Sequence, residues 1–124
     1  MLNQYIKHLA KPVLPDDTPT KLILTRGARA AMAMLTEITI ATLKDPDVLK
    51  VMTRVDNAVR QAVAENRLEM MLRWEDFKVF HIALEKKMAN PTIKEPLEGR
   101  LAQQELLDAC YEAEYQTIKA KRGS

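Results

Sequence analysis

The stretch LTRGARAAMAMLTEITIATLKDP, residues 24–46, decides the fold because it is rich in alanine and methionine and apolar on nearly every side. Alanine and methionine favour a helix, and a helix that is apolar all round is either buried on every side or spans a membrane. Glu37 and Lys44 interrupt the apolar run, which excludes a membrane span. We therefore expect other protein surfaces to cover this helix.

The covering surface has two interpretations, and the sequence leaves both open. The helix is either internal to a compact domain or a contact with another chain. A four-helix bundle has no central helix, because each member keeps one side toward solvent. Small residues let helices approach closely, and methionine adapts to irregular partners. The candidate interface residues are Leu14, Arg26, Arg29, Ala30, Ala33, Met34, Glu37 and Ala41.

The segment before this helix reads as an arm. Pro12, Pro15 and Pro19 prevent a continuous helix through KPVLPDDTPT (11–20) and favour extended backbone. We divide the chain into an arm with a proline-rich connector, residues 1–20, and a single helical domain, residues 21–124. Proline-stiffened arms often reach neighbouring subunits, which favours the intermolecular interpretation.

The rest of the chain predicts an all-α fold of about four helices in a compact, mostly antiparallel array. The first helix covers residues 21–44, with a break at Gly27 and a strand over 21–25 as alternatives. Asp45 and Pro46 start a second helix, on which Val48, Val51, Met52, Val55, Val59, Ala62 and Val63 recur at helical spacing. The third helix runs from a turn near residues 65–67, or straight on from the second helix, to Ala89. The fourth covers about 96–121, with its buried face on Ala102, Leu106, Ala109, Cys110 and Ala113.

Composition agrees with this fold class. A chain of 124 residues is one domain by length, and only 5% aromatic residues with three glycines favour helices over strands. The single cysteine excludes an internal disulfide. The N-terminus has no apolar signal-peptide core, so we expect a cytoplasmic protein, or a virion component in an infected cell.

Few residues suggest chemistry. His81 and Glu85 lie one helical turn apart, a spacing that suits a metal or a proton relay, but no second histidine is in register. We expect a surface or half-buried histidine beside a carboxylate, a solvated face for Glu105, Asp108 and Glu112, and Cys110 in the core. No catalytic residue, cofactor or metal site is predicted, and the chain is not expected to be an enzyme.

The sequence therefore favours a non-enzymatic assembly subunit that binds other protein chains, either copies of itself or a larger complex, and no membrane. By size and helical class it is similar to the head–tail adaptors of tailed phages, a comparison that rests on architecture alone. The alternative is a small nucleic-acid-binding regulator that uses the basic N-terminal third, with Lys7, Lys11, Lys21, Arg26 and Arg29.

Overall fold

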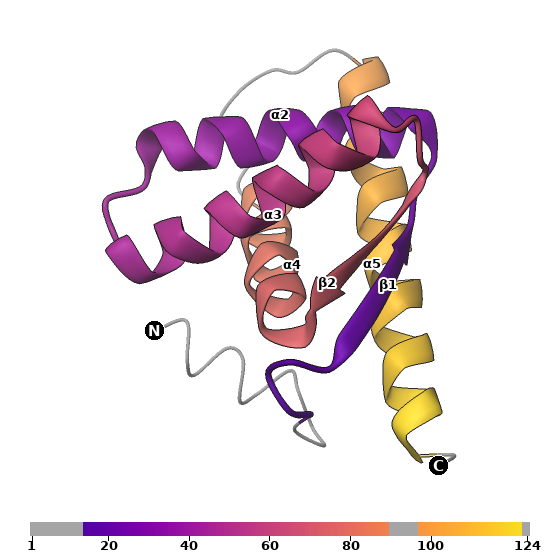
Figure 1. The fold of residues 1–124 in the computed structure, drawn as a ribbon. Coiled ribbons are helices and arrows are strands. Elements are labelled where there is room, and N and C mark those ends of the chain that lie inside the picture. Colours follow the sequence, from indigo (N-terminus) through magenta and orange to yellow (C-terminus); the bar gives the residue numbers. More distant parts are fainter. Residues whose placement is uncertain (1–13, 90–96, 123–124) are drawn as a thin grey trace.

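The computed structural model describes residues 14–89 and 97–122, which form four helices and one small sheet (Figure 1). The helices are α2 (Arg26–Thr42), α3 (Pro46–Ala64), α4 (Trp74–Ala89) and α5 (Leu97–Arg122), and the strands are β1 (Pro19–Ile23) and β2 (Glu69–Arg73). The predicted compact helical fold is confirmed, and the two-stranded sheet is a small addition to it.

The elements enclose one core. α2 packs against both α3 and α5, α5 packs against β1, and α3 packs against β2 and α4. In Figure 1, α2 and α3 lie next to each other at the top, α4 lies to the left of β2, and α5 runs down the right side behind β1. The largest fully buried side chains are Trp74, Phe77, Lys78, Phe80, Leu22, Met32, Met52, Leu84, Leu106, His81, Val55 and Val59.

The first predicted helix begins later than expected, because residues 19–23 form β1. Thr25 ends the extended segment and caps α2, since its hydroxyl accepts a hydrogen bond from the backbone N–H of Ala28 at 3.1 Å. The strand that the sequence offered as an alternative over 21–25 is therefore the better description of this region, shifted by two residues. Gly27 does not break the helix.

The start of the third predicted helix is wrong. Residues 69–73 form β2, which pairs antiparallel with β1 so that Leu22 lies opposite Met70 and Lys21 opposite Met71. Both strands alternate exposed and buried residues. The alternation of exposed and buried side chains in β2 arises because this segment pairs with a strand about fifty positions earlier in the chain. The spacing of apolar residues within the segment does not reveal that pairing.

The remaining helices follow their sequence signals. Asp45 caps α3, with Pro46 at its first position, and α3 buries the predicted apolar face except for Val63, which is 48% exposed. After α3, Asn66 adopts a positive φ of 53°, which turns the chain toward β2. On α5, Leu106, Cys110 and Ala113 are buried as predicted, while Ala102 and Ala109 are partly buried.

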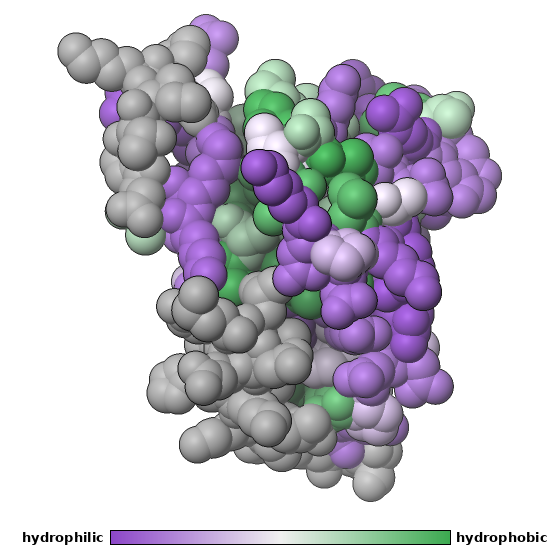
Figure 2. Space-filling model, turned by 90° about the vertical axis from the view of Figure 1, so that its left-hand side faces the viewer, coloured by the Kyte–Doolittle hydropathy of each residue, from purple (hydrophilic) through white to green (hydrophobic). Residues whose placement is uncertain are grey.

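The α2–α3 turn lies at the left-hand end of the molecule in Figure 1, and this end faces the viewer in Figure 2. Figure 2 shows apolar residues in a hollow of this face, bordered by hydrophilic residues. Among the described residues, no helix is long and apolar enough to cross a membrane.

Candidate functional site

An apolar groove lies between α2 and the first turns of α5. Its volume is about 540 Å³. Small residues of both helices and three larger apolar residues of α2 line it, joined by polar residues of α4 and α5: Gly27, Ala30, Ala31, Met34, Leu35, Ile38, Lys87, Glu98, Gly99, Ala102 and Gln103. The groove follows α2 from Gly27 to Ile38, a length of about 17 Å at the helical rise.

Small residues account for the close approach of the two helices. A Cβ atom added to Gly27 would lie 3.7 Å from the Cβ of Ala102 and 3.2 Å from a carboxylate oxygen of Glu105. The same Glu105 oxygen accepts a hydrogen bond from the Thr25 hydroxyl at 2.8 Å, which ties α5 to the capped start of α2. The start of α2 therefore packs closely on α5 at Gly27, and this contact holds the two sides of the groove together.

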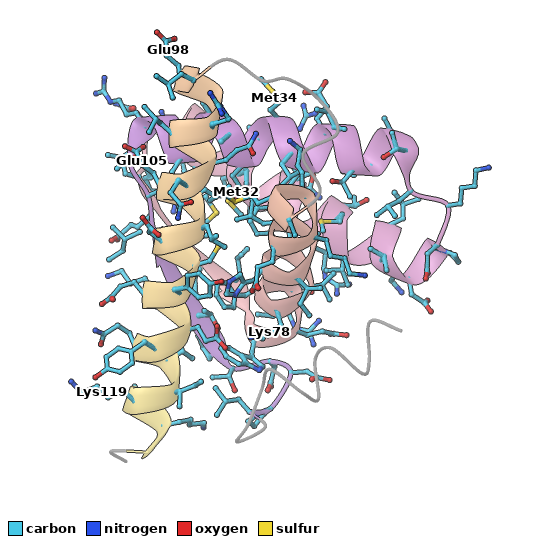
Figure 3. The ribbon with its side chains drawn as sticks, turned by 180° about the vertical axis from the view of Figure 1, so that it is seen from behind. Met32, Met34, Lys78, Glu98, Glu105 and Lys119 are labelled. Carbon is cyan, nitrogen blue, oxygen red and sulfur yellow. The ribbon has the colours of Figure 1, made fainter. Side chains whose placement is uncertain are left out.

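The apolar surface of α2 is divided between the core and the groove. One face is core, because Ala28, Met32 and Leu35 are buried. Another face is open to solvent among the described residues, since Met34 is 64% exposed and Ile38 is 47% exposed. Figure 3 shows Met32 directed into the molecule and Met34 at its outer edge near the start of α5, where Glu98 lies. The helix is neither fully internal nor fully exposed.

Two of the eight predicted interface residues lie in this groove, and the other six lie elsewhere. Ala30 and Met34 line it. Arg26, Glu37 and Ala41 are exposed elsewhere on α2, and Ala33 is partly buried. Leu14 is only 5% exposed, so within this chain it belongs to the core. Sequence reasoning missed the α5 side of the groove, because nothing in the sequence aligns residues 98–103 with α2.

Two basic residues of the N-terminal third, Lys21 and Arg29, have partners within the chain. Lys21 Nζ lies 3.3 Å from a carboxylate oxygen of Glu69, and Arg29 Nη1 donates a hydrogen bond to the Arg67 carbonyl at 2.8 Å. Arg26 is exposed. Lys7 and Lys11 lie outside the described residues. The described part of this region therefore presents mixed charge.

A second feature is a buried polar cluster between α4 and α5. The side chain of Lys78 is fully buried; its ammonium donates to Glu114 at 2.7 Å and lies 5.3 Å from the centre of the Trp74 ring. His81 is 1% exposed, with Nε2 at 3.1 Å from Glu85 and Nδ1 at 3.4 Å from Glu114. Figure 3 shows Lys78 between the two helices. The expectation of a surface or half-buried histidine is wrong, because Glu114 on α5 completes an enclosed cluster.

Burial controls protonation in this cluster. It lowers the pKa of His81 to about 4, and the positive charge of Lys78 acts in the same direction. The two carboxylates are near, but neither ring nitrogen forms a well-aligned hydrogen bond with them, so burial prevails. Burial likewise raises the pKa of the Cys110 thiol to about 12. Both groups are therefore neutral at pH 7.

This cluster is suited to packing rather than to chemistry on a dissolved substrate. The imidazole is enclosed, and the neutral thiol of Cys110, a core residue as predicted, is a poor nucleophile. Within residues 14–89 and 97–122, no group of three or more histidine, cysteine or acidic side chains could hold a metal ion. Glu105, Asp108 and Glu112 are exposed, in agreement with the predicted solvated face.

Comparison with known proteins assigns no relatives: no protein-family model, no curated protein and no solved structure matches this chain. The function is therefore argued from the groove and its surroundings.

Proposed function

We propose that this protein is a non-enzymatic subunit of a larger protein assembly, and that the groove between α2 and α5 receives an apolar helix of another protein chain. The observation that carries the proposal is the solvent exposure of Met34 and Ile38 beside a floor of glycine and alanine. A virion adaptor of the head–tail type is one assembly of this kind.

A helix is the occupant that the groove suits. Its length of about three helical turns accommodates apolar residues that recur every three or four positions on a partner helix. Its small-residue floor permits close approach of a helix backbone, and its flexible methionine rim can adapt to the side chains of the partner. Each large apolar side chain buried there would contribute about 1.5–3 kcal/mol.

The first experiment places a photo-reactive amino acid at Met34 and asks whether it crosslinks a specific chain in the native source. The matched control position is Tyr115, which is 58% exposed and lies on α5 about 25 Å beyond Glu98 along the helix axis. We expect a discrete adduct from position 34 and none from position 115.

The second experiment tests the contribution of the groove to affinity. Met34→Glu or Ala30→Glu should weaken binding of the crosslinked partner by at least about 30-fold, because a charge would enter an apolar contact. Circular dichroism should remain unchanged, and Tyr115→Glu should bind normally. Unfolding of both groove variants would show that the surface is internal core, and normal binding by both would place the partner elsewhere.

A further inference from the structure

The second strand of the sheet has an open edge with an unusual arrangement of side chains. The backbone N–H of Leu24 donates to the Leu68 carbonyl, and that of Trp74 donates to the Thr18 carbonyl. Antiparallel ladders alternate, so these two bonds direct the even-numbered residues of each strand toward its partner. The backbone groups of Glu69, Met71 and Arg73 therefore point away from β1.

The two edges of the sheet are not equivalent. The outer edge of β1 begins with Pro19, which has no N–H, and carries Lys21 at its centre; both features discourage strand addition. The edge of β2 has no proline, and its central residue, Met71, is apolar and 58% exposed. Within the described residues, α3 and α4 also pack against β2, and Arg67 Nη1 donates a long hydrogen bond of 3.4 Å to the Glu69 carbonyl at this edge.

The side chains along β2 are complementary to themselves in charge. Glu69 lies two positions before Met71, and Arg73 lies two positions after it. If two copies of β2 pair antiparallel about Met71, each Glu69 lies opposite Arg73 of the second copy, and the two Met71 side chains meet at the centre. This register also brings the outward-facing backbone groups of both strands together as hydrogen-bonded pairs.

We infer that β2 pairs with β2 of a second copy of this chain, which joins two two-stranded sheets into one four-stranded sheet of order β1-β2-β2-β1. The interface is a two-fold contact, in which each copy contributes the same strand. The side chains of Glu69 and Arg73 are 56% and 46% exposed, and each has an ion pair within its own chain, Glu69 with Lys21 at 3.3 Å and Arg73 with Glu75 at 3.7 Å. Ion pairs this exposed contribute little to stability, so both side chains can turn to a second copy. This surface is separate from the groove between α2 and α5 and does not depend on its occupant.

The test exploits the charge pattern. In a homodimer of Glu69→Lys, the new lysine lies opposite Arg73 of the second copy, so two cations face each other. In a homodimer of Arg73→Glu, the new glutamate lies opposite Glu69 of the second copy, so two anions face each other. Each variant should be monomeric alone, whereas an equimolar mixture should form a heterodimer in which every opposed pair has opposite sign. Mass is measured by light scattering from about 1 µM to about 1 mM, a range that covers weak association.

We expect the unmodified chain to reach twice its monomer mass of 14.1 kDa within this range. Met34→Glu should dimerise normally, which separates this contact from the groove. A monomeric unmodified chain at every concentration, or dimers of both single variants, would overturn the inference. So would failure of the mixture to dimerise when both variants retain the helical circular dichroism of the unmodified chain.

Discussion

Single residues between α4 and α5 show how strongly burial changes the behaviour of an ionisable group. Lys78 has no exposed side-chain surface, yet its ammonium has a carboxylate at 2.7 Å and an aromatic ring beneath it. Removing one member of such a pair would leave the other charge buried and unpaired. His81 lies in the same enclosed region without well-aligned hydrogen bonds and is held neutral by burial.

The neutrality of His81 makes a prediction about acid stability. The pKa is about 4 in the folded protein and 6.5 in the ordinary, unfolded state. Below pH 6.5 the unfolded chain takes up a proton that the folded chain does not, so stability falls as the pH decreases toward 4 and levels off below it. The loss attributable to this group is about 3 kcal/mol.

Urea unfolding at a series of pH values measures this effect. His81→Leu changes the absolute stability but removes the titrating group, so its free energy of unfolding should fall less between pH 6.5 and pH 4 than that of the unmodified protein. The acidic residues common to both proteins cancel in the comparison. Equal pH slopes for the two proteins would show that His81 is protonated without cost in the folded state.

Individual elements differ in how far their own sequence determines them. α3 was predictable, because a cap, a proline and seven apolar residues at helical spacing lie within one segment. β2 was not, because Met70 and Trp74 lie four positions apart as on a helix face, while its strand character depends on β1.

The start of α3 gives a test at the scale of one element. The Asp45 carboxylate accepts hydrogen bonds from the backbone N–H groups of Asp47 at 2.9 Å and Val48 at 3.4 Å. Asp45→Ala removes this cap and should lower the free energy of unfolding by about 1 kcal/mol. Asp45→Asn keeps an acceptor and should lose less than half of that. Urea titration of both variants measures the difference, and equal losses would indicate that the charge rather than the cap stabilises the helix.

At the scale of the whole molecule, the sequence predicted which helix has an apolar surface but not where that surface opens. The groove exists because residues 98–103 of α5 lie against Gly27 and Ala30 of α2, a juxtaposition of segments about seventy positions apart. The polar cluster depends in the same way on Glu114 reaching His81 and Lys78. Composition and periodicity describe segments, whereas both candidate features arise from how segments meet.

The contacts between segments distant in the chain also predict which parts of the molecule unfold locally and which unfold only with the whole. β1 and β2 connect the two ends of the segment that contains α2 and α3, and α5 then packs on β1. The core side chains of β1, α3 and α4 are mutually buried, while Lys119, Ala120 and Lys121 at the end of α5 are exposed. Amide hydrogen exchange should therefore be slowest, and uniform, at Leu22, Met52, Val55 and Phe80, because their exposure requires global unfolding.

Exchange at Lys119–Lys121 should be faster by at least about 100-fold, since fraying of a helix end costs far less than opening the core. Two-dimensional NMR at several urea concentrations resolves both groups of amides: the core amides should share one steep dependence on urea, and the α5 end should show almost none. If Leu22 exchanged as fast as the end of α5 while Met52 stayed protected, the sheet would open on its own, and the pairing of β1 with β2 would not hold the fold closed.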